Sequence, residues 1–206
     1  MATPLSTTAL EALDHIVQDV TTGVIMLCGF PASGKSTGAS HLAATLGALV
    51  LDKDGFAPAL EESIMAELTG NPHDRDSSVY RRVVGPYIYE ALIRNALTIG
   101  QRQPVVLDAP FLEYVKAAAE RGIPLSSYIQ TKTNDPVSVT TIWFSSEPEE
   151  IRRRMVRRAA ARDIPKLSDW PTYRSVVLES EISRDAKATV DTFVFNPDSE
   201  NISPLG

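Results

Sequence analysis

One short motif constrains this chain more than any other feature of its sequence. Residues 29–37 read GFPASGKST, after an apolar run and before a predicted helix over residues 35–46. The spacing G-x-x-x-x-G-K-[ST] is met by Gly29, Gly34, Lys35 and Ser36. Glycines let successive backbone N–H groups line an anion cradle, and the positive end of a helix faces the same anion. The motif therefore predicts a loop that holds the phosphates of a nucleotide.

Each side chain of this loop has an expected task. Lys35 is expected to reach the β- and γ-phosphates, and the Ser36 hydroxyl to complete the shell of a Mg²⁺ ion. Thr37 is expected beside the α-phosphate. A dinucleotide is disfavoured because no G-x-G-x-x-G occurs. The predicted nucleotide-binding residues of the loop are Gly29, Pro31, Ala32, Ser33, Gly34, Lys35, Ser36 and Thr37.

Apolar runs and helical periodicity alternate along the chain. Five short runs read as strands, and stretches of helical spacing separate them. This alternation predicts an α/β domain with a mainly parallel sheet, whose ligands bind at the carboxyl ends of the strands. We expect one domain over residues 1–206, with a leading helix within 1–20 and a mobile tail at 197–206. The expected strands are 23–29, 48–52, 104–110, 137–144 and 188–196, and the expected helices after the third strand are 112–121, 147–162 and 170–184.

Composition narrows the class of protein. The 206 residues include 43% apolar and 22% charged side chains, as in ordinary globular proteins. The formal net charge of −6 argues against a general nucleic-acid binder. The single cysteine suits a reducing cytoplasm, and no apolar run is long enough for a membrane span, so we expect a cytoplasmic protein. The sequence specifies no oligomeric state.

Three aspartates follow predicted strands. Asp52 and Asp54 end the second strand and, two residues apart, face the same side. A carboxylate there can accept the proton of a hydroxyl or hold the metal through water, whereas an ordinary polar turn is the other interpretation. Asp108 ends the third strand, where an acid can lie near Mg²⁺ or cap the next turn. Ala109 and Pro110 follow it, not a second acid, which disfavours hydrolysis as the purpose.

An arginine-rich stretch follows the fourth strand. Six arginines fall between residues 152 and 162. Arg154, Arg158 and Arg162 have the spacing of one helical face, and Arg153 and Arg157 are expected to be exposed. The stretch is either a solvated face or a lid whose guanidiniums neutralise transferring phosphate. On the lid interpretation Arg158 and Arg162 act on the phosphoryl group and Arg154 binds the nucleotide.

Arg82 is a further candidate. It stands beside Arg81 and Tyr80 at the start of a long predicted helix that should kink at Gly85-Pro86. These arginines either bind an anionic group of a substrate or are surface charge.

Taken together, the segments GFPASGKST, LDKDGF, GQRQPVVLDAP and the arginine-rich stretch resemble the P-loop kinases. More narrowly, the chain is similar to the AAA_33-like group that includes chloramphenicol phosphotransferase, zeta toxins and the kinase domain of polynucleotide 5′-kinases. The resemblance covers residues 23–196. Residues 123–136 match no part of the family pattern.

The resemblance implies a fold and a set of roles. The implied fold has three layers, a five-stranded parallel sheet in the order 2-3-1-4-5, and an arginine-rich lid over about 147–184. Asp54 is implied as the base on the acceptor hydroxyl, with Asp52 as an orienting or metal-shell acid and Asp108 near the acceptor and the metal. Asn196 is implied beside the adenine.

The hypothesis from sequence is a Mg²⁺- and ATP-dependent kinase. Its acceptor would be a hydroxyl on a small metabolite or antibiotic-like molecule, with Lys35, Asp54, Arg158 and Arg162 as catalytic residues. The alternatives are a polynucleotide 5′-hydroxyl kinase, a nucleotide-dependent switch or ATPase, and a toxin that acts on a sugar nucleotide.

Overall fold

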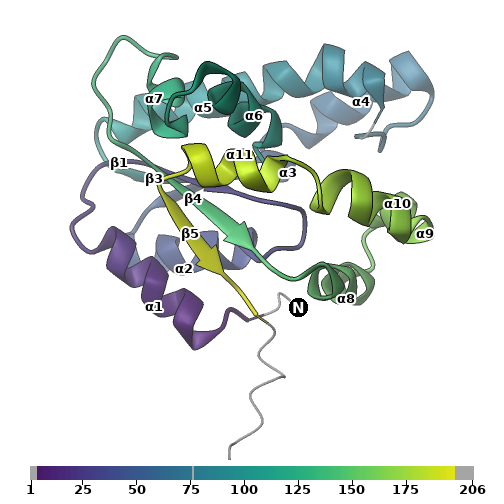
Figure 1. Cartoon of the computed structure of the whole chain (residues 1–206). Helices are drawn as coiled ribbons and strands as arrows, with labels where there is room; N and C mark the ends of the chain where they lie inside the picture. The colour runs from purple at the N-terminus through teal and green to yellow at the C-terminus, as the bar shows by residue number, and fades with distance from the viewer. Residues whose placement is uncertain (1–3, 76, 198–206) are drawn as a thin grey trace, which may run out of the picture.

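The computed structural model describes residues 4–75 and 77–197. Within them, five parallel strands form one sheet in the order β2-β3-β1-β4-β5, which confirms the implied order (Figure 1). The strands are β1 (Gly23–Cys28), β2 (Leu49–Asp52), β3 (Pro104–Asp108), β4 (Val139–Ser145) and β5 (Thr192–Phe195). Every residue of β1 is buried, because helices cover a central parallel strand on both faces.

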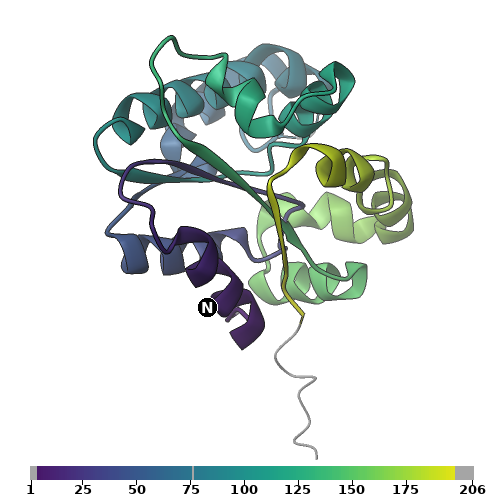
Figure 2. The ribbon, with the colours of Figure 1, turned by 60° about the vertical axis from the view of Figure 1, so that its left-hand side comes forward.

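Helices on the two faces of the sheet complete three layers (Figures 1 and 2). One face carries α1 (Thr7–Val17) and α2 (Lys35–Leu46), and the other carries α5 (Gly85–Gly100), α6 (Leu112–Arg121), α7 (Leu125–Gln130) and α11 (Ile182–Thr189). Successive side chains of β1 alternate between the layers. Ile25 and Leu27 pack with α1 and α2, whereas Met26 and Cys28 pack with the opposite layer.

The segment after β4 differs most from expectation. The helix predicted over 147–162 is α8 (Pro148–Arg158), and it ends where Ala159 adopts a left-handed φ of 48°. The helix predicted over 170–184 is also wrong in extent. Short turns fill this region before α11: η2 (Ala161–Asp163), α9 (Ile164–Ser168), α10 (Trp170–Tyr173) and the π-helical η3 (Arg174–Leu178). Because α11 continues to Thr189, β5 begins four residues later than predicted.

The segment between β2 and β3 contains a one-turn helix, α3 (Lys53–Phe56), then α4 (Pro58–Thr69). A π-helical turn, η1 (Tyr80–Val84), leads into α5 at the predicted kink, where Pro86 cannot donate a backbone hydrogen bond. Residues 123–136, which match no family pattern, contain α7. The mobile tail predicted at 197–206 lies, from residue 198 on, outside the described residues.

None of the helices in the described part of the chain combines the length and the apolar character that a membrane span requires.

A tight contact sets the position of α2 against the sheet. A Cβ placed on Gly38 would lie 2.4 Å from Cζ of Phe144, a fully buried residue of β4. At Gly29, where φ is 132°, a Cβ would lie 2.4 Å from the Phe144 carbonyl oxygen. Both glycines therefore let the motif and its helix approach β4 closely.

We expect Gly38→Ala to destabilise the protein by about 1 kcal/mol or more. Overpacking a core costs roughly 1–3 kcal/mol, which exceeds the gain of about 1 kcal/mol in helix propensity. Urea unfolding measures the change, with the exposed Ser40→Ala of the same helix as a control. A Gly38→Ala protein as stable as wild type would contradict the tight contact.

Candidate active site

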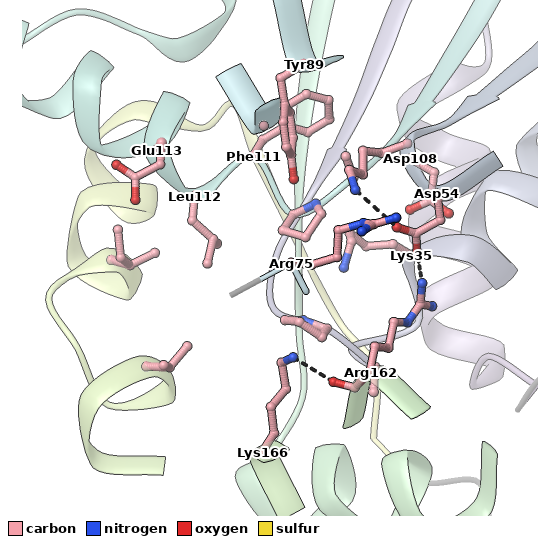
Figure 3. Close-up of a pocket in the computed structure, with 18 of the residues that line it drawn as sticks. Lys35, Asp54, Arg75, Tyr89, Asp108, Phe111, Leu112, Glu113, Arg162 and Lys166 are labelled. Atoms are coloured by element: carbon pink, nitrogen blue, oxygen red, sulfur yellow. Dashed lines mark hydrogen bonds and ion pairs between the residues drawn. The ribbon is translucent and has the colours of Figure 1, made fainter. Parts of the chain in front are cut away.

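A cavity of about 1510 Å³ opens at the carboxyl ends of the strands. The motif, the ends of β2 and β3, the start of α5 and the segment after α8 all contribute to its walls, and Figure 3 shows a close-up. Lys35, Asp54, Asp108, Arg158 and Arg162 line it together. The location agrees with the expectation for a parallel α/β sheet.

The motif forms a phosphate cradle at the N-terminus of α2. Gly34, the residue before α2, has a φ of 112°, and Ala32 has a φ of 64°. Lys35 Nζ donates to the Phe30 carbonyl at 2.8 Å, so its side chain crosses back over the loop. The loop residues that line the cavity are Pro31, Ala32, Gly34, Lys35, Ser36 and Thr37. Gly29 lies behind the loop, and Ser33 is fully buried.

Burial shifts the pKa values of two charged residues next to the cradle, Lys35 and Asp108. Desolvation lowers the pKa of Lys35 to about 8, although Asp108 opposes the shift. Desolvation raises the pKa of Asp108, and a hydrogen bond with Ser36 and the charge of Lys35 oppose it. An anion in the cradle would relieve the buried Lys35 charge, since a charge is stable in the interior when it is paired.

A magnesium ion fits the donor set here. The hydrogen bond between Ser36 and Asp108 brings a hydroxyl and a carboxylate together at the mouth of the loop. The described residues contain no group of three or more acidic, His or Cys side chains that could hold a metal. Mg²⁺ in nucleotide sites commonly takes only one or two protein ligands, with phosphates and waters as the others.

The two aspartates after β2 have different surroundings. Asp52 caps α3: its carboxylate accepts hydrogen bonds from the N–H groups of Asp54 at 3.3 Å and Gly55 at 2.9 Å. Asp54 extends into the cavity, where it pairs with Arg162 and lies 3.6 Å from Lys53 Nζ. Asp52 thus orients the turn that presents Asp54.

Arg158 and Arg162 reach the cavity by different routes. Arg158, at the end of α8, makes a two-point contact with the buried Asp163. Arg162 lies beyond the helix end in η2, so the common helical face predicted for it is wrong, yet its side chain contacts Asp54. Arg157 also lines the cavity, whereas Arg153 pairs with Glu150.

Arg154 supports the phosphate loop from behind. Its Nη1 donates to the carbonyls of Ala32 and Ser33, both at 3.3 Å. Its Nη2 donates to Glu150 at 3.0 Å and to the Asn196 carbonyl at 3.0 Å. Only 5% of Arg154 is exposed, and its guanidinium is hydrogen-bonded to the protein, although the residue also lines the cavity; its role in nucleotide binding stays a prediction.

Asn196, implied beside the adenine, contacts the phosphate loop with its side chain. Its Nδ2 donates to the Ser33 carbonyl, and its Oδ1 accepts from the N–H of Ser6. Asn196 is 1% exposed. The side chain therefore joins the phosphate loop to the segment before α1.

The prediction for Arg82 needs a similar correction. Of the described arginines near η1, Arg75 and Arg81 line the cavity and Arg82 does not. Arg75 lies in the loop after α4, and Figure 3 shows it beside Lys35 and Asp54. Sequence reasoning missed it because a lone arginine in a polar loop gives no periodic signal.

Four aromatic residues at the cavity were also missed. We call Tyr89, Phe111, Tyr114 and Tyr128 the aromatic wall. Neighbouring rings of this wall have centroids 5.4 to 6.1 Å apart. Phe111 follows Asp108 by three residues and has a φ of 52°, a costly conformation of the kind found at functional sites.

We expect Arg154→Met to reduce the free energy of unfolding by about 3–5 kcal/mol, because it strands the buried Glu150 carboxylate and several carbonyls. Arg153→Met, which removes the more exposed partner of the same Glu150, should change stability by less than about 1 kcal/mol. Chemical denaturation of both variants checks this. Equal effects would contradict the supporting role of Arg154.

Lys35 predicts a specific pH dependence in the absence of ligand. Its pKa is about 8 in the folded chain against an ordinary value of 10.5, so the unfolded chain binds more protons between these pH values. The free energy of unfolding should therefore rise from pH 8 to 10.5 by up to about 3 kcal/mol on account of Lys35. Urea unfolding of wild type and Lys35→Met at pH 7 and pH 10 isolates this contribution. Identical pH profiles would refute it.

Comparisons with known proteins identify the family and the fold. A family model described as an AAA domain (AAA_33) matches residues 24–176. Uncharacterised proteins of Mycobacterium tuberculosis and Mycobacterium bovis are 30% identical over 121 residues, which is 55% of this chain and 24% of theirs. The matched region thus spans about a quarter of the length of these relatives.

Solved structures share the fold at low identity. A shikimate kinase from Aquifex aeolicus has a TM-score of 0.54 and 18% identity, covering 84% of this chain and 86% of that one. A shikimate kinase from Bacteroides thetaiotaomicron has a TM-score of 0.53 and 12% identity, with 84% and 85% covered. The protein TT1252 from Thermus thermophilus has a TM-score of 0.51 and 20% identity, with 88% and 92% covered.

The family model covers most of the chain, and the cradle and the strand order agree with it; the chain belongs to the AAA domain family AAA_33 and has the fold of the P-loop kinases.

Proposed function

We propose that this protein is a Mg²⁺-ATP-dependent kinase that transfers the γ-phosphate to a hydroxyl of a small metabolite or antibiotic-like molecule. The observation that carries the proposal is the shared cavity, in which a phosphate cradle and a carboxylate outside the cradle, Asp54, face one space. An ATPase needs an activated water, whereas a kinase needs a group that aligns an acceptor hydroxyl.

In the nucleotide half of the cavity, the backbone of the loop and the charge of Lys35 hold the phosphates. Ser36 and Asp108 would hold Mg²⁺, which supplies charge neutralisation on the phosphate oxygens. Arg158 is oriented toward this space by Asp163, and a guanidinium in such a position can stabilise charge that develops during transfer.

In the acceptor half, Asp54 is the candidate base. Two contacts hold Asp54 in position: its backbone N–H donates to the Asp52 carboxylate, and its own carboxylate lies 3.6 Å from Lys53 Nζ. Arg162 pairs with the Asp54 carboxylate. An acceptor hydroxyl at Asp54 would compete with Arg162 for the carboxylate, and the γ-phosphate of ATP is an alternative anion for this arginine.

Two observations bear on the alternatives. The net charge of −6 favours a small acceptor over a polynucleotide. The shikimate kinases among the solved structures share the fold of this chain, which supports a kinase over a switch. At this low sequence identity the similarity is one of fold alone. The match covers 24% of the length of the curated relatives, so the activity of those whole proteins is not assigned to this chain.

We expect Asp54→Asn to bind Mg²⁺-ATP as wild type does and to lose transfer by roughly 10²–10⁴-fold, because proton acceptance contributes a factor of this size. A mass-spectrometric screen of metabolite and antibiotic pools with Mg²⁺-ATP, run with both proteins, measures the products.

The exposed Asp19→Asn outside the cavity is the matched control and should keep full activity. Full transfer by Asp54→Asn would remove this residue from the mechanism. Phosphorylation of a 5′-hydroxyl oligonucleotide would favour the polynucleotide kinase, and acceptor-independent ATP turnover coupled to a partner would favour the switch.

A further inference from the structure

A buried cluster lies beside Asp54, and we call it the Glu61 cluster: Lys53, Glu61, Arg75 and Tyr80. Glu61 is 1% exposed, and its carboxylate lies 3.0 Å from Lys53 Nζ and 3.0 Å from Arg75 Nε. The Tyr80 hydroxyl donates to the same carboxylate at 2.7 Å. A buried carboxylate requires such partners, so Glu61 fixes both cations in place.

Arg75 is anchored on one side and turned to the cavity on the other. Its Nε binds Glu61, and its Nη1 donates to the Pro72 carbonyl at 2.8 Å. Its Nη2 hydrogen-bonds to none of the residues that the structure describes. Arg75 lines the cavity, and four-fifths of its side chain is buried. A guanidinium held in this way loses little side-chain entropy when it binds an anion.

The charges around this point do not balance. Lys53, Arg75 and Arg162 face Glu61 and Asp54, which gives three cations and two carboxylates among these five side chains. Tyr80 adds no charge, because burial and the hydrogen bond to Glu61 raise its pKa far above its usual range. The surplus among these five side chains is positive, and Arg75 and Arg162 also line the cavity.

The aromatic wall borders the same space. Figure 3 shows the Tyr89 hydroxyl directed into the cavity near Arg75. Burial is the main cause that raises the pKa of Tyr89, and the nearby charge of Asp54 adds to it. This hydroxyl therefore stays a neutral hydrogen-bond donor. Burial raises the pKa of Tyr114 to about 12. Apolar ring faces with neutral hydroxyl edges suit the body of a cyclic ligand.

Resting on the proposed kinase function, we propose that the acceptor is an anionic cyclic compound whose carboxylate or phosphate ester binds Arg75. Its ring packs on the aromatic wall, and its hydroxyl lies at Asp54. Arg75 thereby selects charged over neutral acceptors, and Glu61 acts as the positioning residue for Arg75.

The test measures binding by calorimetry to protein already loaded with Mg²⁺ and a non-hydrolysable ATP analogue, so that a phosphate probe cannot occupy the loop. The probes are hydroxymethylbenzoate, hydroxymethylphenyl phosphate and the neutral benzenedimethanol. At least one anionic probe should bind about tenfold or more tightly than the neutral one, and their ranking separates carboxylate from phosphate recognition.

Arg75→Gln should abolish this preference and leave the neutral probe unchanged, whereas Arg75→Lys, which keeps the charge beside Glu61, should retain part of it. Arg102→Gln, an exposed arginine outside the cavity, is the matched control and should behave as wild type. Thermal unfolding and binding of the ATP analogue establish that each variant is folded.

Three results would overturn the proposal: no binding of either anionic probe to wild type, equal binding of neutral and anionic probes, or an unchanged preference in Arg75→Gln. Failure of the kinase function gives a different result. It appears as no binding of the ATP analogue, or as full transfer by Asp54→Asn, and neither depends on Arg75.

Discussion

The hydrogen bonds of Arg154 to the phosphate loop connect segments from three parts of this structure. One guanidinium contacts the loop, α8 and the residue after β5, segments that are far apart in the sequence. A phosphate cradle works only if its N–H groups point inward, and their carbonyls then point outward and need donors. Arg154 and Asn196 provide those donors in the interior, where few waters could replace them.

This arrangement explains why the nucleotide loop could be predicted from sequence and its supports could not. The spacing of Gly34, Lys35 and Ser36 between an apolar run and a helix is a local signal, and a local backbone conformation follows from it. The positions of Arg154 and Asn196 depend on how α8 and β5 pack against the loop. In the sequence, Arg154 is one of six similar arginines, and only burial distinguishes it from Arg153.

The acceptor half of the cavity also contains residues whose positions depend on packing and could not be predicted from the sequence. Asp52 ends β2, as the apolar run predicted, but Asp54 lies in the one-turn helix α3, so the period of a strand does not account for its position. Arg75 comes from a polar loop, and it acquires a role only because Glu61 of α4 and Lys53 of α3 meet in the fold. The helix boundaries after β4 were wrong for a related reason, since the left-handed turn at Ala159 is not encoded by glycine or proline.

The bond between Asn196 and Ser6 has a practical consequence for any longer protein that contains this domain. It brings both ends of the described chain to the back of the phosphate loop, as the ribbon views also show (Figures 1 and 2). Ser6 and Asn196 are thus linked to the Ser33 carbonyl of the loop through the Asn196 side chain. A displacement of the backbone at Ser6 or Asn196 would therefore reach the nucleotide cradle through these hydrogen bonds.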